Sequence, residues 1–213
     1  FARQEIVRTR NLMYSMSKLG YLMVYMLSLP IVLEISYILN LWLAGTVPEN
    51  TEIFTALVLL NMALGSLNIP ISQTVQAIGV IKYYQVVRSF IVISALPLSW
   101  GCLDFGAPAY MVFVVLVLIN FVNQPVSLYL LKKIFPYSYR EYLRSVILPC
   151  ALFSVFTPII PYGVHCMMDE SFARLLLVGL TSAISTVVVS YLVLLSGREK
   201  SLVNEVFYKL IKN

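Results

Sequence analysis

Hydrophobic residues occur along this chain in long unbroken runs, separated by short polar stretches. A helix needs about 20 mostly apolar residues to cross the hydrocarbon core of a bilayer, and six runs are long enough. The strands of a membrane β-barrel would instead alternate apolar and polar residues over about ten positions, so the unbroken runs exclude a barrel. The pattern predicts an all-α integral membrane protein with six transmembrane helices. They extend over about Leu12 to Leu33, Glu52 to Gly79, Tyr84 to Leu103, Pro108 to Leu131, Tyr142 to Ile160 and Phe172 to Leu195.

Two shorter segments have a pattern suited to the membrane surface. Between the first two runs, Tyr37, Trp42 and Pro48 are typical of a short interfacial helix and turn at headgroup level. At the end of the chain, residues 198–213 place apolar side chains on one helical face and lysines elsewhere, as in an amphipathic helix on the inner membrane surface. The alternative for this tail is a frayed basic segment.

The composition agrees with a membrane protein. Of the 213 residues, 60% are hydrophobic and only 12% are charged, with a mean hydropathy of +0.85, whereas a soluble domain has roughly 25% charged residues. Cys102, Cys150 and Cys166 are far apart and match no metal or redox spacing. The charged, helix-forming start has no signal-peptide pattern, and we expect the chain to be part of a longer protein.

Basic residues indicate the orientation. If the chain crosses six times, every Lys and Arg except Arg174 falls on one side, whereas acidic residues collect on the other. The positive-inside rule then places both ends of the chain in the cytoplasm. The basic residues on that side are Arg3, Arg8, Arg10 and Lys18 around the start of the first run, Lys82 and Arg88, then Lys132, Lys133, Arg140 and Arg144, and finally Arg198, Lys200, Lys209 and Lys212.

The second run carries a stripe of polar and small residues on one helical face. Pro70 lies within it and removes a backbone hydrogen bond, so we expect a kink with freed carbonyls inside the membrane. Such a stripe either lines a water-filled cavity or lets neighbouring helices pack closely and bond to one another. Its members recur at spacings of three and four: Asn61, Gly65, Asn68, Ser72 and Gln76.

The fourth run repeats this arrangement. Asn120, Asn123, Gln124 and Ser127 lie at helical spacing around Pro125. Two helices that each combine a polar stripe with an internal proline favour a cavity whose walls bend during transport.

The turn after the second run contributes a candidate anion site. Gln85 and Arg88 share a helical face, and Arg88 lies about 9 Å deeper than Lys82 at 1.5 Å per residue. A guanidinium just inside the mouth of a cavity would hold a phosphate or pyrophosphate in bidentate fashion. The alternative is that Arg88 extends to the lipid headgroups.

Other polar residues are expected to be ordinary. Glu34 is expected to be an exposed loop carboxylate, and His165 to lie on the surface of a loop without a metal partner. Asp169, Glu170 and Ser171 form the pattern of a helix N-terminus with Ser171 as its cap. We expect no catalysis, because no nucleophile and base pair, phosphate loop or carboxylate pair is present.

The stretches "LNLWLAGTVPENTEIFTALVLL" and "LNIPISQTVQAIGVIKYYQ" resemble the polysaccharide flippases, the O-antigen and capsule exporter branch of the multidrug/oligosaccharidyl-lipid/polysaccharide exporter superfamily. The likeness covers roughly Arg8 to Arg144. It depends on Trp42, Leu43, Val47, Pro48, Glu49, Phe54, Leu57, Gln76, Ala77, Gly79, Ile81, Lys82, Tyr84, Gln85, Pro97 and the basic "LKKIF" at residues 131–135.

The resemblance implies a MATE-like fold of two six-helix bundles followed by two more helices. Residues 1–134 would then be four helices of the second bundle, residues 135–197 the additional pair, and residues 198–213 a cytoplasmic tail. It also implies that the protein flips an undecaprenyl-pyrophosphate-linked oligosaccharide across a bacterial inner membrane, by alternating access coupled to H⁺ or Na⁺.

The same resemblance implies membrane lipids, a polysaccharide polymerase and glycosyltransferases as partners, and no nucleic acid or bound cofactor. Asn, Gln and Ser side chains would contact sugar hydroxyls, and Arg88 would contact the pyrophosphate. Three alternatives remain: a drug or small-molecule exporter of the same fold, a membrane enzyme of glycan assembly, or a non-transporting subunit.

Overall fold

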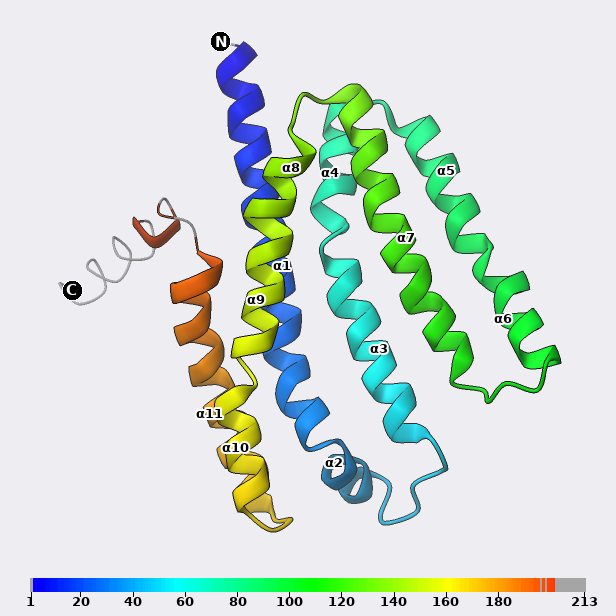
Figure 1. Ribbon diagram of the computed structural model, residues 1–213, viewed down its shortest axis with the longest axis vertical. Coiled ribbons are helices and arrows are strands. Elements are labelled where there is room, and N and C mark those ends of the chain that lie inside the picture. Colours follow the sequence, from blue (N-terminus) through cyan, green and yellow to red (C-terminus); the bar gives the residue numbers. More distant parts are fainter. Residues whose placement is uncertain (1, 196, 198, 202–213) are drawn as a thin grey trace.

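The computed structural model describes residues 2–195, 197 and 199–201, and within them the regular elements are helices (Figure 1). Most of the predicted amphipathic tail lies outside the described residues. The elements are α1 (Ala2–Leu33), α2 (Ile35–Trp42), α3 (Thr51–Ser66), α4 (Ile69–Ile78), α5 (Ile81–Ile93), α6 (Ala95–Asp104), α7 (Met111–Ile134), α8 (Tyr139–Tyr142), the π-helical turn η1 (Leu143–Ile147), α9 (Leu148–Phe156), α10 (Ile159–Met167), α11 (Phe172–Val189) and the π-helical turn η2 (Ser190–Leu194).

These elements join into six spans long and apolar enough to cross a membrane, which confirms the predicted number. The fifth span is longer than predicted, because the helix restarts after Pro158 and continues as α10. His165, which was predicted to lie in a loop, therefore lies on a helix. The short helix predicted between the first two spans is α2, where Trp42 is 80% exposed. The spans are Gln4–Leu33, Thr51–Ile78, Ile81–Asp104, Met111–Ile134, Tyr139–Met167 and Phe172–Leu194.

Proline accounts for two interruptions inside these spans. The second span breaks between α3 and α4 at Leu67 and Asn68, and Pro70 occupies the first turn of α4, where a missing N–H is tolerated. In the fifth span, Pro149 follows η1, where the N–H of Leu148 bonds to the Leu143 carbonyl five residues earlier. The predicted kink at Pro70 is confirmed.

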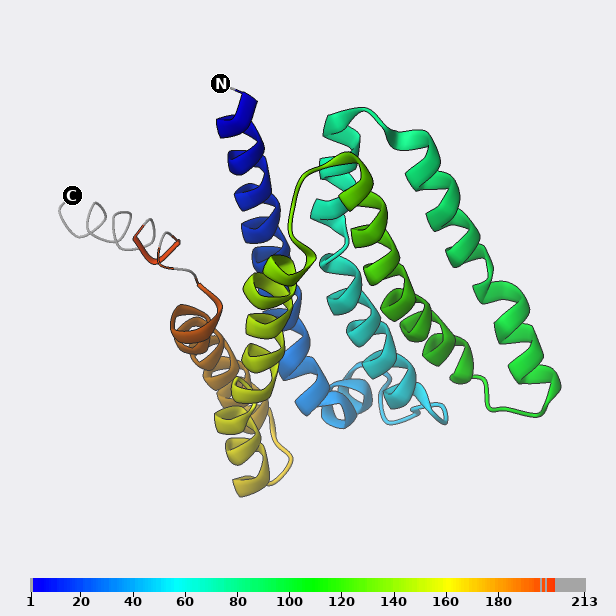
Figure 2. The same ribbon diagram turned by 45° about the horizontal axis from the view of Figure 1, so that its top comes forward.

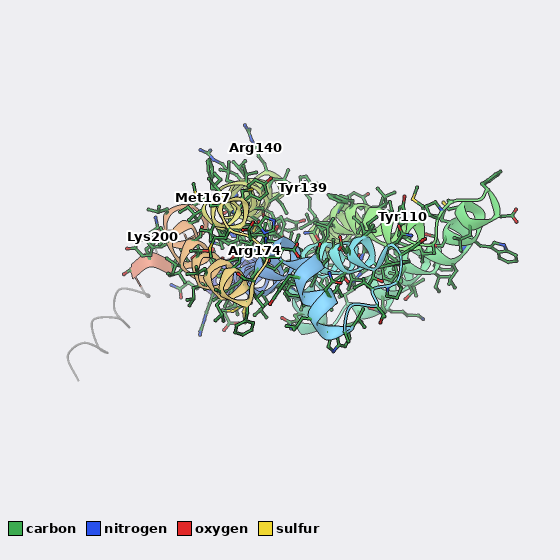
Figure 3. The ribbon with its side chains drawn as sticks, turned by 90° about the horizontal axis from the view of Figure 1, so that it is seen from below. Tyr110, Tyr139, Arg140, Met167, Arg174 and Lys200 are labelled. Carbon is green, nitrogen blue, oxygen red and sulfur yellow. The ribbon has the colours of Figure 1, made fainter. Side chains whose placement is uncertain are left out.

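The helices form an open row, with α1 near its middle. On one side of α1 pack α3 and α4, then α7, and finally α5 with α6 at the far edge. On the other side lie α9, α10 and α11 (Figures 1 and 2). Seen from below, this row is much wider than it is thick (Figure 3). As a result, only 11% of the most apolar 18-residue stretch of the Ile81–Asp104 span is buried within the protein.

Successive connections alternate between the two ends of this row (Figure 1). The start of α1 and the α4–α5 and α7–α8 connections lie at one end, called here the basic end because Arg8, Lys82 and Lys132 lie there. The α2–α3, α6–α7 and α10–α11 connections lie at the other end, with Glu49 and Asp104. The predicted segregation of charge is therefore observed at these connections, whereas Lys18 lies within α1, and Arg198, Lys209 and Lys212 are outside the described residues.

The main apolar core lies in the basic half, where α1, α4, α7 and the start of the fifth span meet. Ile71, Leu131, Tyr142 and Phe153 are fully buried within it. Tyr137, in the connection before α8, donates its hydroxyl to the Leu128 carbonyl at 2.5 Å, and burial raises the pKa of this hydroxyl above its usual value.

Candidate functional site

The break between α3 and α4 exposes a backbone carbonyl to side chains from two other spans. The Leu67 carbonyl lies 3.5 Å from Ser17 Oγ on α1 and 3.5 Å from the Tyr142 hydroxyl at the end of α8. The two side chains also lie 3.4 Å apart and are fully buried. A break in the helix, and not a loop at the surface, therefore brings these polar groups together inside the protein.

Asn68 is the most unusual group at this break. Its side chain is only 3% exposed, yet within the described part of the chain neither Nδ2 nor Oδ1 has a hydrogen-bond partner. Burying an amide without partners costs several kcal/mol in an apolar medium, so such groups normally bind water, an ion or a ligand. Asn68 is therefore the strongest candidate for a substrate or solvent contact.

The polar stripe of α7 reaches the same place. Gln124 donates from Nε2 to the Tyr142 hydroxyl at 3.3 Å, and its buried Oε1 has no partner among the described residues. One turn away, Ser127 Oγ lies 3.5 Å from Oδ1 of Asn123, which is only 2% exposed. The fourth span thus contributes Gln124 to a polar cluster with Ser17, the Leu67 carbonyl and Tyr142, next to Asn68 in the chain, whereas Asn123 and Ser127 face each other as a separate buried pair.

Nearer the acidic end, α3 and α7 bond directly to each other. Asn120 donates from Nδ2 to Asn61 Oδ1 at 2.6 Å. This contact is what the packing alternative predicts for the stripes, and it separates these two residues from the buried cluster. At the other end of the α4 stripe, Ser72 is half-buried and Gln76 is exposed.

The predicted anion site lies at the surface of α5. Gln85 is exposed, and the guanidinium of half-buried Arg88 lies over the ring of Tyr84, 5.6 Å from its centroid. Such stacking holds a guanidinium by cation–π attraction. The Nε atom of Arg88 is buried and has no hydrogen-bond partner in the described part of the chain.

At the acidic end, the expectation that Glu34 is an exposed carboxylate is wrong. Its side chain is fully buried, and Oε2 accepts hydrogen bonds from Nε and Nη2 of Arg174, at 3.0 and 2.8 Å. Arg174 comes from the first turn of α11, within the group formed by α1, α10 and α11 (Figure 3). Ser171 caps that helix as predicted, because its Oγ accepts from the Arg174 N–H at 3.2 Å.

His165 completes this acidic-end cluster. Its Nδ1 lies 2.8 Å from Oε1 of Glu34, and its side chain is 30% exposed, so the prediction of a surface residue is only half right. The ring also stacks on Tyr162. One sequence signal could have revealed the cluster: Arg174 is the one basic residue expected on a side rich in carboxylates, and such a charge near a membrane needs a partner.

The described residues contain no group of three or more His, Cys, Asp or Glu side chains that could hold a metal ion. Comparison with known proteins finds no matching protein family, no matching curated protein and no matching solved structure. The fold and the buried cluster therefore define a class and no more: a multi-pass helical membrane protein with a polar helix break inside one span.

Proposed function

We propose that this protein is part of a polysaccharide flippase of MATE-like fold, which moves a lipid-linked oligosaccharide across the bacterial inner membrane. The observation that carries the proposal is the interrupted second span, with the amide of Asn68 at the break lacking a hydrogen-bond partner among the described residues. Broken helices with polar groups inside the membrane are the recurrent way in which transporters build substrate and ion sites. The break lies about 15 Å from the basic end of the span, from ten residues at 1.5 Å each.

The chemistry of the buried cluster suits a sugar. Amides and hydroxyls both donate and accept hydrogen bonds, as sugar hydroxyls do. Arg88 would contact the pyrophosphate that links the sugar to its lipid, because a guanidinium recognises phosphate oxygens in bidentate geometry. The charge segregation supports loading from the cytoplasm, since the basic end would face inward by the positive-inside rule. The resemblance at Trp42, Pro48, Glu49, Gly79 and Lys82 supports the choice of this family.

In this proposal, the Asn61–Asn120 pair is a packing contact that closes the helices on the acidic side of the cluster. Opening to the other leaflet would separate α3 from α7 at this pair. The coupling ion, H⁺ or Na⁺, would bind elsewhere on the pathway or at the freed carbonyl of Leu67.

Complementation tests the proposal. The full-length parent protein, carrying Asn68→Leu, Asn123→Leu or Arg88→Ala, is expressed in cells that lack their own polysaccharide flippase. Surface polysaccharide, lipid-linked precursor and membrane levels of the protein are measured. We expect surface polymer to fall at least tenfold in the Asn68 variant, with precursor accumulating, because an apolar side chain at the break removes a sugar contact worth about 1.4 kcal/mol or more.

Two matched controls accompany these variants. Thr181→Val removes a hydroxyl that bonds to its own helix at Leu177, and Lys82→Ala removes an exposed charge six residues before Arg88. Both should transport normally. Full surface polymer in all three test variants would refute a transport role for these residues. Absence of complementation by the unaltered parent, together with export of a lipophilic dye, would instead favour the drug-exporter alternative.

A further inference from the structure

A second polar feature lies at the basic end, next to the polar groups of the helix break, because its lining residues Lys18 and Glu141 directly adjoin Ser17 and Tyr142 in the chain. A cavity of about 1000 Å³ opens between the first half of α1, the stretch from α8 to α9, and the end of η2 with the residues that follow it. Three of the side chains that line it are basic: Arg8, Arg10 and Lys18. The volume is sufficient for a lipid headgroup and the start of its chains, since small-molecule sites occupy about 300 to 1000 Å³.

The deepest part of this cavity already holds an anionic group. Glu199 accepts hydrogen bonds from Ser15 Oγ and from Lys18 Nζ. Lys18 was predicted to flank the first span but is 5% exposed within it, and its Nζ also donates to the Leu194 carbonyl at 3.2 Å. Donors of this kind inside a membrane span are costly without an anion, and the carboxylate of Glu199 meets that need, so this part of the cavity favours a negative group.

The outer part of the cavity offers further donors. Nη1 of Arg10 lies 3.3 Å from Oε2 of Glu141, whereas its buried Nε has no hydrogen-bond partner among the described residues. Arg8, two residues closer to the start of α1, is exposed and makes no ion pair within the described part of the chain. Two guanidinium groups with spare donors can hold a phosphate through several hydrogen bonds at once.

We infer that this cavity binds a phosphate group at the basic membrane surface, the headgroup of an anionic phospholipid or free phosphate, in exchange with the carboxylate of Glu199. A phospholipid is well suited to the position, because the cavity lies where headgroups meet the ends of the spans and its wall includes apolar Leu12 and Val193. When the phosphate binds, Lys18 and Ser15 exchange one anion for another, and the carboxylate of Glu199 no longer accepts from them.

Binding to the purified full chain tests the inference. Native mass spectrometry in neutral detergent measures the affinity for phosphatidylglycerol, with zwitterionic phosphatidylcholine as reference, and inorganic phosphate is titrated separately. We expect the double variant Arg8→Gln, Arg10→Gln to bind phosphatidylglycerol at least tenfold more weakly, because each basic residue near an anionic lipid contributes about fivefold. Glu199→Gln should bind it more tightly, since the competing carboxylate is gone.

Matched variants separate this site from general electrostatics. Arg140→Gln removes an exposed basic side chain at the same end that points away from the helices (Figure 3), and Glu5→Gln removes an exposed carboxylate of α1 outside the cavity. Neither should change the affinity. Binding of phosphatidylglycerol that inorganic phosphate does not displace identifies the lipid as the source, and cavity-dependent binding of phosphate alone identifies the free ion.

The inference is overturned if neither probe binds, or if Arg140→Gln weakens binding as much as the double variant does. It is also overturned if Glu199→Gln leaves the affinity unchanged, because the carboxylate would then not compete. These readouts measure binding and not transport, so a protein that fails to restore surface polysaccharide still tests the cavity.

Discussion

The buried ion pair between Glu34 and Arg174 gives the sharpest prediction about stability. Glu34 ends the first span and Arg174 begins the last, 140 residues later in the sequence, so the pair fastens the two spans at the acidic end. The Arg174 side chain is 7% exposed and that of Glu34 is fully buried. Replacing Arg174 by Gln would leave the carboxylate of Glu34 with the His165 ring as its remaining partner among the contacts described above.

The expected loss of unfolding free energy follows from this burial. Removing one partner of a buried pair costs about 3 to 5 kcal/mol, because the other charge remains out of water without compensation. The two hydrogen bonds, at 2.8 and 3.0 Å, are charge-assisted and place Arg174→Gln toward the upper part of that range. The double variant Glu34→Gln, Arg174→Gln should lose less than Arg174→Gln alone, because no unpaired charge is then buried.

Reversible unfolding in mixed micelles, followed by circular dichroism, measures these differences. Glu170→Gln is the matched control: this carboxylate lies 3.7 Å from the same guanidinium but is 61% exposed, so its loss should cost less than about 1 kcal/mol. If Arg174→Gln costs no more than Glu170→Gln, the Glu34 carboxylate is solvated and the reasoning fails.

Three further predictions concern the contacts of the second span with its neighbours and the turn that follows this span. Asn61→Ala and Asn120→Ala should show a coupling energy of about 0.6 kcal/mol in a double-mutant cycle of unfolding, and purely additive losses would mean that the two amides do not bond. Tyr142→Phe should lower the unfolding free energy by about 1 to 2 kcal/mol, because it leaves buried polar partners unpaired. Tyr83 is exposed, so Tyr83→Phe should leave the unfolding free energy unchanged. Equal effects of the two variants would contradict the buried position of the Tyr142 hydroxyl. Gly79 has φ +85° with open space around it, so Gly79→Ala should lower the unfolding free energy by about 1 kcal/mol through backbone strain alone, and Gly79→Asn should lower it less. Thermal unfolding in detergent compares the two variants. An unchanged unfolding midpoint for the Ala variant would argue against the left-handed turn.

The sequence by itself determined the features that depend on local chemistry. Apolar length set the number of spans, proline chemistry set the break near Pro70, and the Ser171 hydroxyl set the start of α11. The alternation of basic and acidic connections followed from the number of crossings. Each of these depends on residues within a few positions of one another, so a pattern along the chain was sufficient to predict it. The fifth span was the exception, since a helix that restarts after Pro158 looks like a helix that ends.

Only the tertiary structure decided which polar groups meet. The sequence placed Glu34 in an exposed loop and Lys18 beside a span, but packing against α11 and η2 buries both with partners more than a hundred residues away. Packing likewise divided one predicted stripe into a bonded pair at Asn61 and, at Asn68, an amide with no hydrogen-bond partner in the part of the chain that the structure describes. Helical periodicity shows which residues share a face, but a buried charge or amide is stabilised by what the opposite helix brings, and that depends on how distant segments pack.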